Sequence, residues 1–164
     1  MTSIPDRRSI VGIDPTERGL AFVFFEGGHL IDWGTWRDDG NELALLDRLL
    51  DGFAADVLVL EDADASGCLR RPRVREMLRA MARHAKRRRR TVTKVSRQEV
   101  RSHWKQHGAK TKYAIAAAIA ERFADLAMVL PPPRKIYRSE DARVQIFDAA
   151  SLVLHAFDPA RLGP

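Results

Sequence analysis

Three acidic side chains occupy positions where a charged group is not expected to stabilise the fold: the ends of two apolar strands and the apolar face of a helix. Asp14 ends one apolar run, "IVGID", and Glu61 ends another, "VLVLE". Asp148 lies inside the helical pattern "QIFDAASLVLHAF", among apolar neighbours one turn before and after it. An unpaired, ionised carboxylate on such a face is costly. Each acid has an ordinary explanation alone, such as an Asp-Pro turn for Asp14, but their joint occurrence favours a shared site.

A bound cation would make this arrangement favourable. Three carboxylates brought together repel one another by roughly several kcal/mol in a poorly screened site. Mg²⁺ prefers such hard oxygen ligands, keeps several of its waters and accepts phosphate oxygens, and we expect Mn²⁺ to substitute for it. Two such ions about 4 Å apart can activate a water molecule and stabilise the leaving oxygen of a phosphodiester. The three acids therefore predict a magnesium-dependent site for phosphodiester hydrolysis.

The apolar periodicity predicts the elements that would position these acids. Strands at 10–14, 20–25 and 30–36 form an antiparallel meander, and further strands follow at 56–61 and 91–95. Helices are expected over 42–53 with Asn41 as cap, from Pro72 onward, after a Ser96 capping box, over 112–125 and over 140–157. A helical crossover makes the first and fourth strands parallel, so Asp14 and Glu61 share one sheet edge if these strands are adjacent.

The fold class is therefore α/β: a mixed five-stranded sheet, with three antiparallel strands and then parallel strands, flanked by helices. The 164 residues suit a single domain with a core over about 8–158. The chain is 45% apolar and 30% charged and has no run of about 18 apolar residues, so we expect no membrane partner. It has one cysteine, Cys68, and this fits a reducing cytoplasm.

The positive charge of the chain is concentrated in one segment. Residues 70–101 hold fourteen of the 28 basic side chains and two of the 22 acidic ones, so the rest of the chain is net acidic. A solvated helix face is the ordinary explanation, but solvated faces usually mix signs, and a polyanionic partner would relieve the repulsion. The residues expected to contact nucleic acid are Arg87, Arg88, Arg89, Arg90, Lys94, Arg97, Arg101, Lys110 and Lys112.

The motifs "GIDPTERGLAFVFFEGG", "VLVLED" and "DAASLVLHAF" together resemble the RuvC-type Holliday-junction resolvases, which have a ribonuclease H-like fold. The middle of the chain, "VTKVSRQEVRSHWKQHGAKTKYAIAAAIAERF", is similar to the family's strand, basic helix, glycine, lysine and helix. The resemblance covers most of residues 8–157. It implies a magnesium-dependent, structure-selective DNA endonuclease that resolves four-way junctions in recombination and repair, acts as a homodimer and is found with the nucleoid in the cytoplasm.

Carried over by resemblance, Asp14, Glu61 and Asp148 match the metal-binding acids of the family. Lys112 matches a lysine that contributes to DNA binding and catalysis, and Arg101 stands where the family has another basic residue. The chain departs from the pattern one turn before Asp148, where Gln145 replaces an acid. An amide oxygen can ligate Mg²⁺ without adding charge, so Gln145 is expected to be a weak ligand. Asp141, about 10 Å from Asp148 along a helix, is a second weak candidate.

Two other functions remain open from the sequence. Gln145 and the altered loops are compatible with a catalytically weak or inactive nuclease-like module that only binds nucleic acid. A ribonuclease H-like nuclease that processes RNA would also fit the acids and the basic segment. Cleavage of junction, flap, duplex and RNA substrates discriminates among the three.

Overall fold

The computed structural model describes residues 8–37, 40–133 and 141–157. Its strands are β1 (Ser9–Thr16), β2 (Gly19–Glu26), β3 (His29–Arg37), β4 (Val57–Glu61) and β5 (Thr91–Val95). Its helices are α1 (Glu42–Gly52), α2 (Pro72–Arg87), α3 (Arg97–Gln106), α4 (Lys112–Arg122), α5 (Ala124–Ala127) and α6 (Val144–Ala156). In the described part of the chain, none of the helices has the length and apolarity to cross a bilayer.

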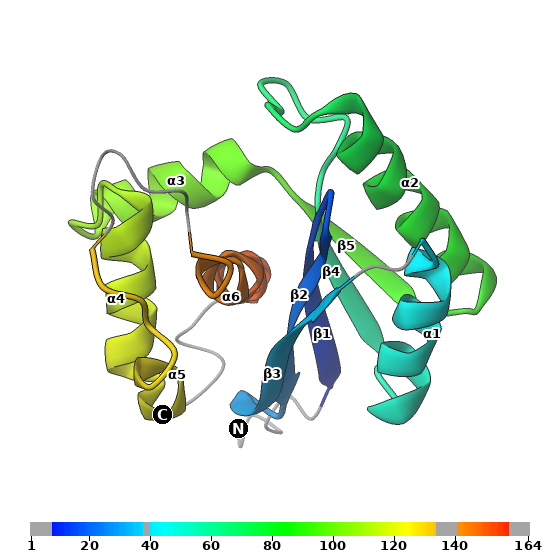
Figure 1. Ribbon diagram of the computed structural model, residues 1–164, viewed down its shortest axis with the longest axis horizontal. Coiled ribbons are helices and arrows are strands. Elements are labelled where there is room, and N and C mark those ends of the chain that lie inside the picture. The colour runs from blue at the N-terminus through cyan, green and yellow to red at the C-terminus, as the bar shows by residue number, and fades with distance from the viewer. Residues whose placement is uncertain (1–7, 38–39, 134–140, 158–164) are drawn as a thin grey trace, which may run out of the picture.

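The five strands form one sheet in the order β3-β2-β1-β4-β5. β1 pairs antiparallel with β2, and β2 with β3, whereas β1–β4 and β4–β5 are parallel. Helices α1 and α2 cover one face of the sheet, and α6 covers the other with α3, α4 and α5 outside it (Figure 1). The mixed sheet predicted from the sequence is confirmed, and β1 lies at its centre between β2 and β4.

Local sequence signals account for most element boundaries. The Asn41 side chain accepts a hydrogen bond from the amide of Ala44 at 3.2 Å and so caps α1 as predicted. Pro72 occupies the first turn of α2, where its missing N–H costs nothing. The predicted apolar stripe of α2 is buried in full: Val74, Leu78, Met81 and Ala85.

Two predicted details of the helices are wrong. Ser96 makes no side-chain capping bond at the start of α3, and its side chain lines a surface cavity instead. The helix expected over 112–125 breaks at Phe123, whose backbone is extended. The Phe123 ring packs edge-to-face on Phe25 with 5.5 Å between centroids, an arrangement that aromatic pairs prefer. The expected start of the last helix at Glu140 lies outside the described residues.

Gly12 sets how closely α6 approaches the sheet. A Cβ atom at this position would lie 3.0 Å from the carbonyl oxygen of Ala149 and would collide with the side chain of Val153. The absence of a side chain therefore lets α6 lie directly on β1, two residues before Asp14. This contact determines the distance between the sheet edge and the acid carried by α6.

Replacing Gly12 with alanine is expected to lower the free energy of unfolding by about 1–3 kcal/mol, because α6 must shift away from β1. Urea unfolding followed by circular dichroism measures the change. Gly52→Ala is the matched control, since an added Cβ there meets nothing within 4 Å. Equal stabilities of the two variants would show that α6 does not depend on this close approach.

Candidate functional site

The parallel register of β1 and β4 brings the first two acids together. Gly12 pairs with Val59, and the same register carried two residues further places Asp14 beside Glu61. Side chains alternate along a strand, so Asp14 and Glu61 both face α6, as Gly12 and Val59 do. Both acids are buried, with relative exposures of 1% and 4%. The predicted convergence of two strand-end acids at one edge therefore follows from the register.

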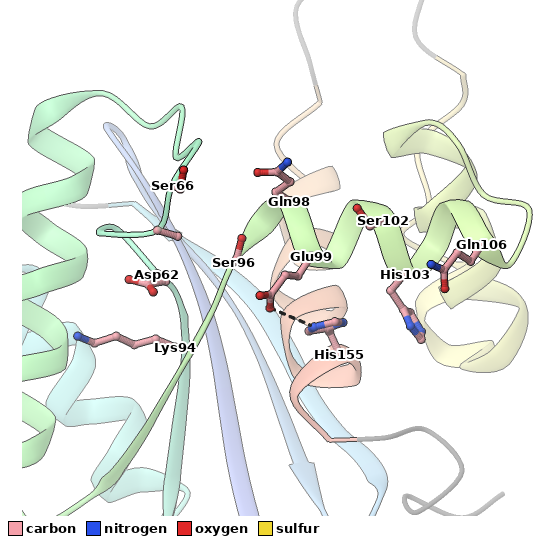
Figure 2. A pocket seen from close by; sticks show the side chains of 11 residues that line it. Asp62, Ser66, Lys94, Ser96, Gln98, Glu99, Ser102, His103, Gln106 and His155 are labelled. Atoms are coloured by element: carbon pink, nitrogen blue, oxygen red, sulfur yellow. Dashed lines mark ion pairs between the residues drawn. The ribbon is translucent and has the colours of Figure 1, made fainter.

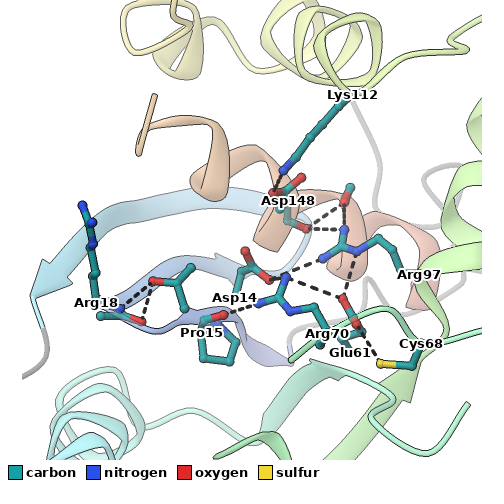
Figure 3. Close-up of polar contacts among 12 residues, drawn as sticks. Asp14, Pro15, Arg18, Glu61, Cys68, Arg70, Arg97, Lys112 and Asp148 are labelled. Atoms are coloured by element: carbon teal, nitrogen blue, oxygen red, sulfur yellow. Dashed lines mark hydrogen bonds and ion pairs between the residues drawn. The ribbon is translucent and has the colours of Figure 1, made fainter. Parts of the chain in front are cut away.

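Helix α6 brings the third acid to the same edge. Asp148 precedes Ala149, the residue whose carbonyl contacts Gly12, so the close packing of α6 on β1 delivers its carboxylate to Asp14. Its side chain is 13% exposed. Ser151, buried one turn later, donates a hydrogen bond of 2.7 Å to the Asp148 carbonyl. We call Asp14, Glu61 and Asp148 the acid cluster (Figure 3).

Two arginines lie within the acid cluster. The Arg97 guanidinium donates from Nε to Glu61 Oε1 at 3.1 Å and from Nη2 to Asp14 Oδ1 at 3.5 Å. Arg70 Nη1 lies 3.4 Å from Asp14 Oδ1 and 4.0 Å from Glu61 Oε1, and the same side chain donates to the Pro15 carbonyl. Figure 3 shows both groups pointing in between Asp14 and Glu61. The Cys68 thiol donates to Glu61 Oε2 at 3.6 Å.

The burial of these charges shifts two pKa values. Burial and the charge of Asp148 raise the pKa of Asp14 to about 6, although Arg70 and Arg97 act in the opposite direction. Burial disfavours the charged form of Arg97, but the carboxylates of Asp14, Asp148 and Glu61 outweigh it and raise the pKa of its guanidinium. Arg97 is therefore a permanent cation, whereas burial makes the ionised form of Asp14 unfavourable.

The raised pKa of Asp14 predicts a gain in stability when its charge is removed. The folded protein holds this proton more tightly than the unfolded chain, whose value is 3.8, so stability falls as pH rises from about 4 to 6 and stays lower above that. Without divalent metal, Asp14→Asn is expected to raise the free energy of unfolding by roughly 2–3 kcal/mol at pH 7.5 and to change it little at pH 4.

Urea titrations in EDTA at both pH values measure this difference. Asp32→Asn, on the exposed side of β3, is the control for the substitution itself. A destabilised Asp14→Asn protein at pH 7.5 would mean that the ion pairs with Arg70 and Arg97 outweigh the burial of the charge.

The other predicted site residues are divided by the structure. Lys112, the first residue of α4, lies with Nζ 2.9 Å from Asp148 Oδ2 and belongs to the site (Figure 3). Gln145 lines the same cavity as Asp14 and Asp148. Asp141 instead makes a two-point ion pair with Arg143, which holds the pKa of its carboxyl at about 2. The acid cluster therefore gains Gln145 as a neighbour, and we remove Asp141 from the candidate ligands.

The densest part of the basic segment lies away from the acid cluster. Residues 86–90 precede Thr91, which pairs with Val57 at the start of β4, so they lie at the opposite edge of the sheet from Glu61. Arg88 pairs with Asp51 of α1 at 2.9 Å, and Arg90 pairs with Asp51 and donates to the Ala55 carbonyl. These two arginines link α1 to the end of α2 and to the turn before β5, so their guanidinium groups are engaged within the protein, away from the acid cluster.

Other cations of the predicted set surround the site. Arg101, Lys110 and Lys112 line the cavity on the Glu61 side of the acid cluster, together with Lys105. Lys94 lines a neighbouring cavity of about 670 Å³ between the ends of β4 and β5 and helix α3. Figure 2 shows this second cavity with Ser66, Ser96 and Gln98 around it. Residues of the loop that follows Glu61 line both cavities, and the second cavity carries two acids, Asp62 and Glu99, as well as Lys94.

Sequence reasoning does not identify Arg70 and Ser151 as residues of the acid cluster, and it predicts a nucleic-acid contact for Arg97. The structure places the Arg97 guanidinium against Glu61 and Asp14. The signal for Arg97 was present, because it comes two residues after Val95, which pairs with Glu61 at the end of β5. Arg70 comes from the loop between β4 and α2, whose path the pattern does not predict.

The donor set of the acid cluster fits one divalent cation better than two. Asp14, Gln145 and Asp148 present hard oxygen donors to one cavity, on the side away from Arg97. The space between Asp14 and Glu61 is taken by guanidinium groups. Across the described ranges, no group of three or more histidine, cysteine, aspartate or glutamate side chains is arranged to hold a metal ion.

The sheet order and the packing of α6 on β1 define a ribonuclease H-like fold. Among solved structures, the chain is similar to Thermus thermophilus RuvC, alone (TM-score 0.62, 16% identity, 94% of this chain and 96% of that chain) and in complex with a Holliday junction substrate (TM-score 0.61, 16%, 95% and 96%). It is similar also to the yeast mitochondrial Holliday junction resolvase Ydc2 (TM-score 0.63, 15%, 98% and 82%). The protein therefore has the RuvC-like fold. No family model and no curated protein matches the sequence.

Proposed function

We propose that this protein is a divalent-cation-dependent endonuclease that hydrolyses phosphodiester bonds in branched DNA, with four-way junctions as the preferred substrate. One observation carries the proposal: Asp14, Glu61 and Asp148 converge at the carboxyl edge of a RuvC-like sheet, with the Lys112 ammonium on Asp148. Burying acidic side chains costs folding free energy. Groups with such a cost and a shifted pKa cluster at functional sites, so the burial of these acids favours a functional role.

The residues of the site have distinct roles in this proposal. Asp14 and Asp148 would hold a Mg²⁺ ion with help from the Gln145 amide oxygen, and the chemistry supplied by such an ion would be activation of a water and neutralisation of charge on the scissile phosphate. Lys112 is half exposed, so its ammonium can leave Asp148 and donate to a phosphate oxygen. Arg101, Lys105 and Lys110 line the cleft next to it and bind the backbone of the DNA.

The similar structures support the branched substrate. RuvC of Thermus thermophilus has been solved with a Holliday junction, and Ydc2 is a Holliday junction resolvase. Leu69, 82% exposed, lies at the rim of the cavities on both sides of the acid cluster and offers an apolar contact to an unstacked base. The loop carries no aromatic side chain, so the sequence preference at the cut is not carried over.

Cleavage of end-labelled four-way junction, flap, duplex and RNA hairpin substrates tests the proposal. We expect metal-dependent cleavage of the junction with Mg²⁺ or Mn²⁺, paired nicks in opposite strands and little cleavage of linear duplex. Preferential cleavage of RNA would favour the RNA-processing alternative. Identical traces for the wild type and for Asp14→Asn would contradict an enzymatic role of the acid cluster.

A second candidate is a module that binds branched nucleic acid without cutting it. The ion pairs of Arg70 and Arg97 with the acid cluster, and Gln145 in place of an acid, favour this function. It predicts junction binding that is equal in EDTA and Mg²⁺ and that weakens steeply with salt, and no cleavage with either metal. Electrophoretic mobility shifts at several salt concentrations, run beside the cleavage assay, separate the two candidates.

We also propose that two copies act together on one junction, because symmetric cleavage needs two acid clusters. The outward face of α2 carries Arg73, Glu76 and Arg83 rather than apolar residues. A contact between copies at this helix would rest on ion pairs, with shared phosphates between them. Light scattering after gel filtration is expected to show two protein copies per junction, and one copy would contradict the homodimer.

A further inference from the structure

The Arg97 side chain is fixed inside the acid cluster by contacts in several directions. Its guanidinium donates to Glu61 at 3.1 Å, to Asp14 at 3.5 Å, to the Ser151 hydroxyl at 3.1 Å and to the Asp148 carbonyl at 3.4 Å. The side chain is 17% exposed. It starts at the first residue of α3, directly after β5, so the backbone also fixes where it begins. A side chain anchored in this way stays in place when the site is occupied.

The formal charges of the cluster balance without a metal ion. Asp14, Glu61 and Asp148 carry three negative charges, and Arg70, Arg97 and Lys112 lie against them with three positive charges. A divalent cation can enter only where one of these cations leaves. Lys112 is 50% exposed and Arg70 25%, and they are the groups that can move outward.

The cleft also divides into two chemically different halves. Asp14 and Gln145 line one half, and Glu61, Arg97 and Ser151 line the other. Asp148, Arg70 and Lys112 line both halves. The amide at position 145 adds no negative charge to the site, and the guanidinium at position 97 adds a positive charge. Together they reduce the demand for a second ion.

We propose that Arg97 permanently occupies the Glu61 half of the acid cluster, so that the centre binds a single divalent cation in the Asp14–Asp148 half. The guanidinium supplies the second positive charge, and Glu61 positions it rather than holding a metal. This inference rests on the proposed nuclease function but concerns how many ions the site takes. Arg97 acts as a positioning residue for Asp14 and Glu61, and a guanidinium group stays charged at every working pH.

Counting bound Mn²⁺ tests the proposal without relying on activity. Equilibrium titration of the full chain, followed by the loss of the free Mn²⁺ signal in electron paramagnetic resonance, gives the stoichiometry in the absence of DNA. We expect one ion per wild-type chain, two per chain in Arg97→Ala, and one in Arg97→Lys. Arg101→Ala, at an exposed arginine one turn later on α3, is the matched control and should bind one ion.

Two substitutions in the acid cluster keep the test decisive if Arg97→Ala does not fold. Asp148→Asn should weaken Mn²⁺ binding at least about tenfold, because it removes a charged ligand. Glu61→Gln should weaken it less than about threefold, because Glu61 contacts Arg97 and not the ion. Two ions on the wild-type chain, or a loss in Glu61→Gln as large as that in Asp148→Asn, would overturn the inference and leave the nuclease proposal standing.

A wild-type chain that binds no Mn²⁺ would overturn the one-ion centre as well. The cleavage assay in Mg²⁺ then decides the proposed function separately, since junction cleavage without a bound ion in the free protein would place the ion on the DNA complex. Absence of both binding and cleavage would leave the nucleic-acid-binding module as the function of the chain.

Discussion

Replacing Asp14 with asparagine is expected to lower the rate of junction cleavage by about 1,000-fold or more. Asp14 is the central acid of the cluster, contacted by Arg70 and Arg97 and raised in pKa by burial and by Asp148. In the proposed function, the substitution removes a charged ligand of the metal ion. A 1,000-fold loss of rate corresponds to about 4 kcal/mol of lost transition-state stabilisation. Single-turnover cleavage of a labelled four-way junction measures the rate.

The junction affinity and the folding stability of this variant are not expected to fall with its cleavage rate. Junction affinity in EDTA should be unchanged or higher, because a negative charge next to the phosphates is gone. Stability at pH 7.5 should rise, as argued from the pKa of Asp14. A protein that is more stable and binds its substrate but does not cut it would identify Asp14 as functional. Cleavage within tenfold of the wild type would place the chemistry elsewhere.

Replacing Lys112 with methionine is expected to lower the cleavage rate at saturating protein by about 100-fold to 1,000-fold. Its ammonium lies 2.9 Å from Asp148 and its side chain is half exposed, so it can reach both the acid and a bound phosphate. Methionine keeps most of the packing of the aliphatic stem and removes the charge. Single-turnover rates at several protein concentrations separate catalysis from binding.

Lys105→Met is the matched control for Lys112. Lys105 is an exposed residue of α3 that lines the same cavity. Its loss should weaken junction binding and reduce the slope of log affinity against log salt by about one, with no change in rate at saturation. Equal rate losses in the two variants would show that Lys112 contributes only to the general attraction of the cleft for DNA.

The basic segment shows how the charge pattern along a sequence can differ from the distribution of charge around a site in the folded protein. The run 86–90 has the highest charge density, yet it forms the end of α2 and the turn before β5. It therefore lies at the opposite ends of the strands from Glu61. Arg88 and Arg90 neutralise carboxylates of α1 there. The cations at the cleft come from less dense parts of the sequence, around α3 and the start of α4. Charge density along a chain does not measure charge density in space.

The strands, most of the helices and the common position of the strand-end acids were predictable from the sequence. Strand alternation and helix periodicity are local properties, and the parallel crossover follows from the order of the elements. Asp14, Glu61 and Asp148 were predictable because each is marked by its place in its own segment. The resemblance to the RuvC-type resolvases implies a role for Lys112 in DNA binding and catalysis, from the local motif around it.

The arginines between the acids are placed there by tertiary contacts that the sequence does not reveal. Arg70 leaves a loop whose path has no periodic signal, and Arg97 reaches the cluster because β5 pairs with β4 and α3 starts at that edge. The closeness of Asp148 to Asp14 depends on Gly12, where the missing side chain admits α6. The contacts of Arg97 with Glu61 and Asp14 alone join residues 36 and 83 positions apart along the chain. They depend on packing among side chains, which no single segment specifies.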